Sequence, residues 1–186
     1  NDTIRAEDGF DIVHGQAGTD QIWGGLQDDQ LHGGSENDQI WGEDGKDLIH
    51  GNTGQDTLRG GAGADEIYGD EDNDTIHGES DPDKIYGGGG VDVIHAGAGN
   101  NLVYGDDKPG DNTGAEGGDT ITALNDSDTI YGQGGADIIS AGDGNNLIRG
   151  AAGADIITAG AGNHIIHGEA DADIIVAGAG NSIVYG

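Results

Sequence analysis

The amino-acid sequence predicts an all-β fold, a parallel β-roll or β-solenoid in which coils of 18 residues stack along one axis. Three observations lead to this prediction. A nine-residue phrase repeats from Ala6 onward in twenty units without a change of length. Position 1 of each unit is Gly or Ala, and position 8, counted from Ile4 to Val184, is Ile, Leu or Val in twenty of twenty-one cases. Nine residues make two and a half helical turns, so these aliphatic residues cannot share one helix face.

Each position of the unit has an expected structural role. Glycine at position 1, and at position 4 in thirteen of the twenty units, allows a positive φ, so positions 1 to 6 are expected to form a turn. Positions 7 to 9 are expected to form a short strand with position 8 pointing inward. Two units then make one coil, the turns stack along two edges, and the strands stack into two short parallel sheets.

The composition of the chain excludes several kinds of partner and of stabilising site. Among 186 residues, acidic side chains outnumber Lys and Arg by 36 to 6, and the formal net charge is −30. Such a polyanion repels nucleic acid and anionic membrane surfaces, so neither is an expected partner. No apolar run is long enough to span a bilayer. Cysteine is absent, which excludes disulfides and thiolate zinc sites. Because the chain starts and ends within the repeat, we expect it to be a fragment of a larger protein.

Several units resemble a known repeat. The units GQAGTDQIW (15–23), GGAGADEIY (60–68) and GQGGADIIS (132–140) are similar to the RTX, or haemolysin-type, calcium-binding nonapeptide GGxGxDxUx. The resemblance extends over nearly the whole chain, and it implies calcium ions bound in the stacked turns of a β-roll. In that family each ion lies between two turns that are 18 residues apart.

The resemblance assigns the metal-binding carboxylates to position 6. It implies, for one site, a carboxylate and two carbonyls from each turn, namely Asp29 with the carbonyls of Gly25 and Gln27, and Asp47 with the carbonyls of Gly42 and Asp44. The full set of expected metal-binding carboxylates is Asp2, Asp11, Asp20, Asp29, Asp38, Asp47, Asp56, Asp65, Asp74, Asp83, Asp92, Asp119, Asp128, Asp137, Asp155 and Asp173.

Counting in steps of 18 distributes these carboxylates over two edges. One edge is expected to run from Asp2 to Asp92, and the other from Asp11 to Asp83 and then from Asp119 to Asp173. Adjacent aspartates then form twelve pairs, so about twelve calcium ions are expected against the net charge of −30. One aliphatic residue in nine buries little apolar surface compared with the conformational entropy that folding removes. We therefore expect the chain to be disordered without calcium and to fold with it.

The first departure from the repeat is the unit GDDKPGDNT (105–113). Gly110 stands at the aspartate position, Asn112 at the core position, and Pro109 lacks a backbone donor. We expect a bulged loop that separates an N-terminal block, 1–104, from a C-terminal block, 114–186, within a single roll, 1–186. A boundary between two domains is the alternative.

The second departure is the loss of aspartate at position 6. Asn146, His164 and Ser182 replace it on one edge, and Asn101 replaces it once on what counting makes the other edge. Neutral side chains are poor calcium ligands, whereas stacked Asn side chains can form hydrogen bonds along an edge. We therefore expect the C-terminal coils to bind calcium on one edge only.

The outward positions carry rows of similar residues. Position 9 is expected to align His14, His32, His50, Tyr68, Tyr86, Tyr104 and Thr122 on one face, and Arg5, Trp23, Trp41, Arg59, His77 and His95 on the other. Ring stacking accounts for such rows, while a transition-metal strip and an aromatic platform for polysaccharide are the functional alternatives. Apolar residues near the C-terminus are expected to form exposed faces that, with the roll ends, favour self-association; these residues are Ile138, Ile156, Ile174, Leu147, Ile165 and Ile183.

These observations favour a calcium-binding, calcium-folded structural module with no catalytic activity. The resemblance implies a secreted bacterial protein of the adhesin, surface-layer, matrix or fibre type, exported by type I secretion and located outside the cell or on its surface. The alternative is the non-catalytic secretion, folding or substrate-binding region of an RTX extracellular enzyme or toxin. Catalysis is not expected, because the row Asn146, His164 and Ser182 has no orienting acid or oxyanion hole.

Overall fold

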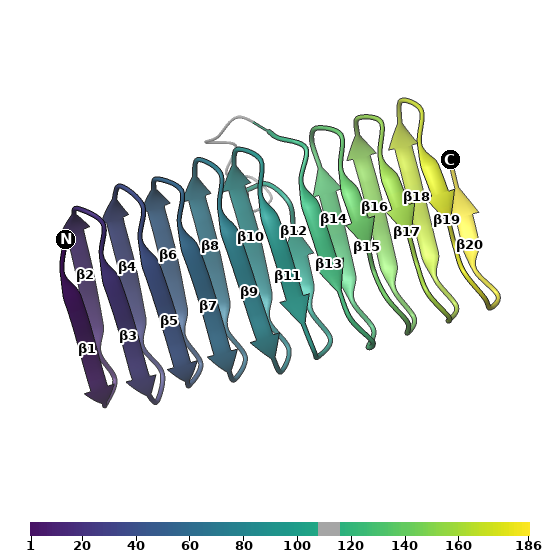
Figure 1. Ribbon diagram of the computed structural model, residues 1–186. Helices are drawn as coiled ribbons and strands as arrows, with labels where there is room; N and C mark the ends of the chain where they lie inside the picture. Colours follow the sequence, from purple (N-terminus) through teal and green to yellow (C-terminus); the bar gives the residue numbers. More distant parts are fainter. Residues whose placement is uncertain (108–115) are drawn as a thin grey trace.

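The computed structural model describes residues 1–107 and 116–186, which form one elongated stack of coils (Figure 1). The described residues contain twenty strands and no helix, and the strands form two parallel sheets. The predicted all-β solenoid is confirmed. No described segment is a helix long and apolar enough to cross a membrane.

Odd-numbered strands form the first sheet and even-numbered strands the second, and hydrogen-bonded neighbours follow in chain order. The first sheet contains β1 (Thr3–Asp8), β3 (Gln21–Leu26), β5 (Gln39–Asp44), β7 (Thr57–Ala62), β9 (Thr75–Ser80), β11 (Val93–Gly97), β13 (Thr120–Ala123), β15 (Ile138–Ser140), β17 (Ile156–Thr158) and β19 (Ile174–Val176). The second contains β2 (Ile12–Ala17), β4 (Gln30–Ser35), β6 (Leu48–Thr53), β8 (Glu66–Glu71), β10 (Lys84–Gly89), β12 (Leu102–Tyr104), β14 (Thr129–Gln133), β16 (Leu147–Ala152), β18 (Ile165–Ala170) and β20 (Ile183–Tyr185).

The core is a double column of position-8 side chains. In the first sheet Ile22 pairs with Ile40 in register, and both are fully buried. Position 8 alternates in direction with its neighbours along the strand, so positions 7 and 9 face outward. The two columns meet between the sheets and form one continuous hydrophobic cluster along the roll.

Most strands are longer than the three residues expected from the repeat. β3, for example, continues through positions 1 to 3 of the next unit, because Gly25 and Leu26 pair with Glu7 and Asp8 of the preceding coil. Three-residue strands occur only as β12, β15, β17, β19 and β20 among the described residues. Positive φ is found at positions 2 and 4, as at Gln16 (φ 74°) and Gly18 (φ 114°), and not at position 1 as expected.

One coil is longer than the others. Paired residues are 18 apart elsewhere, but Val93 pairs with Thr120 and Leu102 with Thr129, a separation of 27 residues. The unit 105–113, which has no aspartate at position 6 and no aliphatic residue at position 8, therefore adds no half coil, because it has no side chain for the core. The bulged loop expected at 105–113 falls largely on residues 108–115, which lie outside the described residues. Both sheets continue across this point.

The long coil corrects the expected assignment of edges. Nine residues are half a coil, so the chain resumes on the opposite edge from the one found by counting in steps of 18. The first edge, which precedes the strands of the first sheet, consists of Asp2, Asp20, Asp38, Asp56, Asp74, Asp92, Asp119, Asp137, Asp155 and Asp173. The second edge consists of Asp11, Asp29, Asp47, Asp65, Asp83, Asn101, Asp128, Asn146, His164 and Ser182.

Candidate metal centre

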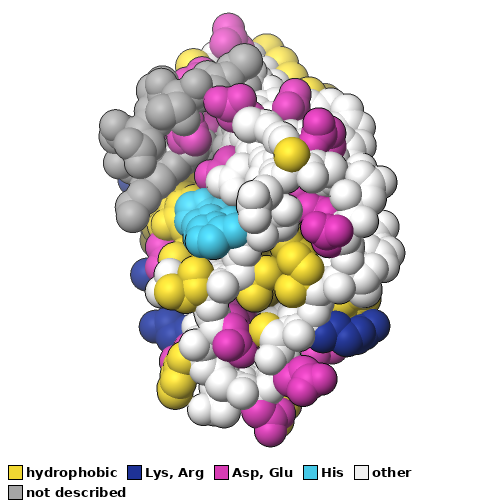
Figure 2. Space-filling model, turned by 90° about the vertical axis from the view of Figure 1, so that its left-hand side faces the viewer, with side chains coloured by type: hydrophobic (Ala, Val, Ile, Leu, Met, Phe, Trp, Pro, Cys, Tyr) yellow, Lys and Arg dark blue, Asp and Glu magenta, His cyan; other side chains and the backbone are white. Residues whose placement is uncertain are grey.

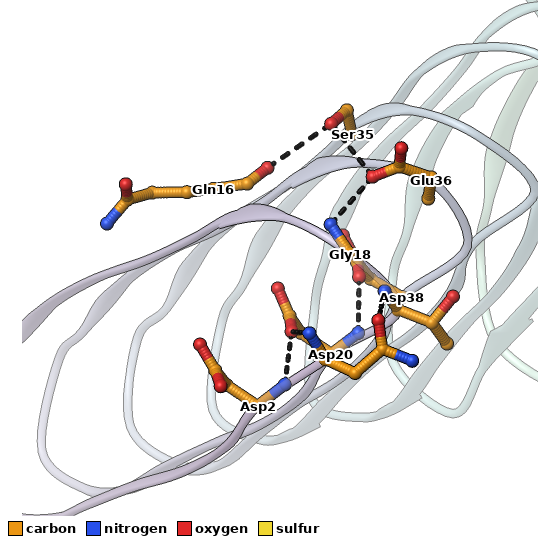
Figure 3. A network of polar contacts seen from close by, with 9 residues as sticks. Asp2, Gln16, Gly18, Asp20, Ser35, Glu36 and Asp38 are labelled. Atoms are coloured by element: carbon orange, nitrogen blue, oxygen red, sulfur yellow. Dashed lines mark hydrogen bonds and ion pairs between the residues drawn. The ribbon is translucent and has the colours of Figure 1, made fainter.

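Stacked aspartates line both edges of the roll. The backbone N–H of Asp20 donates to Oδ1 of Asp38 at 2.7 Å, and the N–H of Asp38 donates to Oδ1 of Asp56 at 2.7 Å. Figure 3 shows the start of this row, in which Asp2, Asp20 and Asp38 follow one another along the edge. Away from the roll ends these side chains are buried, with 2% exposure or less. Each carboxylate therefore joins two coils through one of its oxygens.

The second carboxylate oxygen is left without a partner. Burial of a charged oxygen without a hydrogen bond or a counter-ion is costly, so a regular row of such atoms fits the binding of cations. Oδ2 is buried and has no hydrogen-bond partner among the described residues in Asp11, Asp20, Asp29, Asp38, Asp47, Asp56, Asp65, Asp74, Asp83, Asp92, Asp119, Asp128, Asp137 and Asp155.

Burial also shifts the protonation of these carboxyl groups. Desolvation, together with the charges of neighbouring Asp92 and Asp56, raises the pKa of Asp74 to about 9. Desolvation likewise raises the pKa of Asp83 and Asp119 to about 8. Burial in the stacked turns therefore favours the protonated form of these carboxyl groups, and a nearby cation would favour the charged form.

The unpartnered oxygens point toward backbone oxygens of the next coil. A Cβ atom built on Gly24 would lie 2.6 Å from Oδ2 of Asp29 and 2.8 Å from the carbonyl oxygen of Gly42, so both oxygens border the same space. The Asp44 carbonyl accepts a hydrogen bond from the N–H of Gln27 (2.7 Å) and retains a second lone pair. No group of three or more His, Asp or Glu side chains suited to a metal occurs in 1–107 and 116–186. A metal here would therefore need carbonyl as well as carboxylate oxygens, which suits a hard cation such as calcium.

The two edges differ in their number of aspartate-on-aspartate steps. The first edge has nine and the second has four in the described residues, against the twelve in total that counting predicted. The additional step joins Asp92 to Asp119, whose Oδ1 accepts from the N–H of Asp92 at 2.8 Å. Figure 2 views the roll from the end where β1 lies and shows Asp and Glu side chains at many points of that end.

After Asp83 the second edge lacks aspartate at every described position except Asp128. Asn146 accepts from the N–H of Asp128 through Oδ1 (2.9 Å) and donates through Nδ2 to the carbonyl of Ala141 (2.8 Å). His164 accepts from the N–H of Asn146 at 3.4 Å, and its other ring nitrogen lies 3.3 Å from the Gly160 carbonyl. The expected hydrogen-bonded edge is present, but its bonds run from side chain to backbone and not between amide side chains.

Asn101 belongs to this same edge, contrary to the expectation that it lay on the other. It stands between Asp83, whose N–H donates to Asn101 Oδ1 at 3.0 Å, and Asp128. All four replacements of aspartate in the described residues thus fall on one side of the roll, and the first edge keeps its carboxylates from end to end. The two edges of the C-terminal coils therefore differ in their hydrogen bonds, and calcium on one edge only stays a prediction.

Sequence reasoning missed Asp106. This residue is at position 2, where side chains are usually exposed, yet its exposure is only 4%. Its carboxylate accepts from the N–H of Gly134 at 2.7 Å and of Gly117 at 3.3 Å. Burial raises its pKa to about 6. Asp106 therefore ties the beginning of the long coil to its end and to the following coil, a role that the repeat pattern gave no reason to expect.

The outward aromatic rows differ from expectation after the long coil. Seven rings form one continuous stack with centroids 4.5–5.2 Å apart, in which Tyr131 follows Tyr104 where Thr122 was expected; the rings are His14, His32, His50, Tyr68, Tyr86, Tyr104 and Tyr131. Thr122 instead pairs with His95 on the first sheet. The cause is again the half-coil offset.

The stacking weakens both functional interpretations of these rows. Trp23 and Trp41 stack with centroids 4.6 Å apart and a 2° angle, and the Arg5 guanidinium covers Trp23 at 4.0 Å. Ring faces that a sugar would use are therefore taken by neighbours. In the histidine row, parallel rings direct their in-plane lone pairs side by side, whereas a metal needs convergent nitrogens.

Five of the six apolar C-terminal residues are exposed as expected, whereas Leu147 is half-buried. Ile138, Ile156 and Ile174 on the first sheet are 50%, 43% and 59% exposed. Ile165 and Ile183 on the second sheet are 42% and 52% exposed. Self-association through these faces stays a prediction.

Comparison with known proteins agrees with the repeat and with the site. A family model described as an RTX calcium-binding nonapeptide repeat (4 copies) matches residues 1–31, 24–58, 50–85, 77–107, 113–148 and 149–184. A search of curated proteins found no match. The matched ranges include both edges and all the stacked aspartates described above.

Proposed function

Because the chain belongs to the family of RTX calcium-binding nonapeptide-repeat proteins, we propose that it is a calcium-folded structural part of a secreted bacterial protein. The β-roll is a structural calcium-binding module. The observation that carries the proposal is the row of buried Oδ2 atoms without hydrogen-bond partners in the described residues of both edges. In this role the folded chain is an extended, rigid extracellular roll, as an adhesin, surface layer, matrix or fibre requires.

Two stacked aspartates and the nearby turn carbonyls would hold each ion. Calcium accepts six to eight oxygen ligands, and when bound it supplies the positive charge that the ladder lacks. The chain contributes by bringing carboxylates of successive coils together and by burying them away from water. At one step the proposed ligands are the carboxylates of Asp29 and Asp47 with the carbonyls of Gly25, Gln27, Gly42 and Asp44.

The proposed sites are distributed unevenly along the roll. Coils up to Asp83 carry aspartate steps on both edges, and later coils carry them on the first edge alone. On the second edge, Asn101, Asn146 and His164 provide hydrogen bonds between coils in place of an ion. We propose that residues 1–186 act as one roll, because both sheets continue across the long coil.

The extracellular location is also part of the proposal. RTX repeats are typical of secreted bacterial proteins. The chain has no cysteine, so an oxidising environment would not stabilise it by disulfides. Calcium, which is abundant outside the cell, would supply that stability after export.

Calcium titration tests the proposal directly. In buffer containing a chelator we expect circular dichroism at neutral pH to show a disordered chain, and added calcium to produce the strand signal cooperatively. Magnesium at the same concentration is the control, because it requires a smaller octahedral site and retains its waters, and we expect it to leave the chain disordered. A strand spectrum that is the same with and without chelator would contradict the proposal.

A further inference from the structure

The roll carries more aspartate-on-aspartate steps before the long coil than after it. Nine steps precede the long coil and are divided between both edges. Three steps follow it, all on the first edge, while Asn146 and His164 join coils of the second edge by hydrogen bonds. The N-terminal block, 1–104, therefore needs more cations to compensate its buried carboxylates than the C-terminal block, 114–186.

The long coil lacks backbone bonds that the preceding coils possess. β6 and β8 pair through five residues, from Leu48 opposite Glu66 to Thr53 opposite Glu71, and these include positions 2 and 3. β12 and β14, which are neighbours in the second sheet (Figure 1), pair only through Leu102–Tyr104. Since each coil of a solenoid contacts only its neighbours, the bonds at this interface determine whether the two blocks fold together.

The carboxylate of Asp106 takes the place of the absent backbone bonds. In a regular coil the position-4 N–H donates to a carbonyl of the next coil, as Gly45 does to Ala62 at 2.9 Å. At the long coil, the position-4 N–H of Gly117 donates instead to Oδ1 of Asp106 at 3.3 Å. Oδ2 of Asp106 accepts from the N–H of Gly134, in the following coil, at 2.7 Å. Asp106 is only 4% exposed, so water cannot readily replace it as the acceptor.

Gln133 reinforces the same junction from the following coil. Its Oε1 accepts from the N–H of Asp106 at 3.2 Å, and its Nε2 donates to the carbonyl of Asp107 at 3.1 Å. Four hydrogen bonds that involve a side chain thus join residues 106–107 to the turn of Asp119 and to the following coil.

We infer that Asp106, supported by Gln133, couples the two blocks so that the whole roll folds at one calcium concentration. This inference rests on the proposed function and refines it, because it concerns how the calcium sites of the two blocks are filled together. Without Asp106, the C-terminal block would fold at a lower calcium concentration, since it has fewer carboxylates to compensate. The one step that spans the long coil, from Asp92 to Asp119, cannot replace this coupling, because it forms only when the turns of both aspartates are folded.

Two spectroscopic probes distinguish the blocks in a calcium titration of the full chain. The two tryptophans, Trp23 and Trp41, both lie in the N-terminal block, whereas circular dichroism reports the strands of both blocks. For the wild type we expect tryptophan fluorescence and circular dichroism to change at the same calcium concentration, as in a single cooperative transition. For Asp106→Ala we expect two transitions in circular dichroism, with tryptophan fluorescence following only the one at higher calcium. Gln133→Ala should separate the transitions in the same order.

Asp28→Ala is the matched control. The side chain of Asp28 also accepts a backbone N–H of the following coil, that of Lys46 at 2.9 Å, but the nearby strands β4 and β6 retain their full pairing. Its removal takes away one carboxylate and one bond between coils of the same block. We therefore expect its two signals to change together, as in the wild type.

Coincident signals in Asp106→Ala would overturn the inference, and so would separate transitions in the wild type. Failure of Asp106→Ala to fold in saturating calcium would also overturn it, because each block is expected to fold without the other. A tryptophan signal that follows the transition at lower calcium would contradict the expected order of the blocks. These results leave the proposed function intact. A wild-type strand signal that does not depend on calcium would instead overturn the proposed function.

Discussion

Without calcium, the folded roll is expected to be most stable in acid and to lose stability as the pH rises from about 4 to about 9. Burial raises the pKa of Asp56, Asp65 and Asp137 to about 7 and that of Asp74 to about 9, above the value of 3.8 expected in the unfolded chain. The folded state therefore binds more protons than the unfolded state in this range. Its stability is fully present below the unfolded pKa and is lost as the pH rises through the folded values.

The size of this effect is large relative to the stability of a domain. A buried group with a folded pKa of about 7 destabilises the deprotonated roll by on the order of 4 kcal/mol. A change of this size is a large part of the roughly 5–15 kcal/mol by which domains are usually stable. Protonation at about pH 5 should thus replace part of what calcium does, by removing the charge from the carboxylates.

Circular dichroism in chelating buffer across this pH range measures the effect. The control is the same series in saturating calcium, where protons compete with the ion and stability should instead fall toward acid. A chelated chain whose strand signal grows as the pH rises would contradict the argument. Identical pH profiles with and without calcium would also contradict it.

Ile76→Ala is expected to destabilise the calcium-loaded roll by about 2–5 kcal/mol. Ile76 lies on β9 between Leu58 and Ile94 of the adjacent coils and is fully buried. Because each coil of a solenoid contacts only its neighbours, a cavity in a central coil weakens both of its interfaces. Urea unfolding followed by circular dichroism in saturating calcium gives the change in free energy.

Ile165→Ala is the matched control for this substitution. Ile165 is the same residue type on a strand of the same roll, but it is at position 7 and is 42% exposed. We expect its replacement to change the free energy of unfolding by less than about 0.5 kcal/mol. Similar losses for the two variants would mean that position 8 is not the core.

The sequence was sufficient to predict the coil, the two sheets and the core. Position 8 from Ile22 to Ile166 is fully or almost fully buried in the described residues, as its aliphatic pattern, interrupted only at Asn112, indicated. The hydrogen-bonded neutral edge also followed from Asn146 and His164. These predictions succeed because they depend only on the local period and on side-chain chemistry.

The predictions that failed depended on how units are joined in space. A nine-residue unit without a core residue keeps the sequence period but adds no half coil to the stack. Counting therefore placed Asp119 on the edge of Asp83, whereas its Oδ1 accepts a hydrogen bond from the N–H of Asp92. The expected role of Gly51 was also wrong, because crowding with Asp56 is visible only when the side chains of the turn are placed. Asp106 was missed because its partner Gly134 is remote in sequence.

The long coil also sets a parity rule for growth of the roll. Insertion or loss of a whole coil leaves every later residue on its own edge. Insertion of half a coil moves every later unit to the opposite edge, unless the inserted residues are left out of the stack. Exclusion of one unit here leaves Asp92 followed by Asp119 and Tyr104 followed by Tyr131. Had that unit formed a half coil, Asp119 and the aspartates that follow it would lie on the second edge, which now contains Asn146 and His164. Because the unit that lacks an aliphatic core residue is left out of the stack, the first edge keeps its aspartates on both sides of the long coil. The residues that replace aspartate all remain on the second edge.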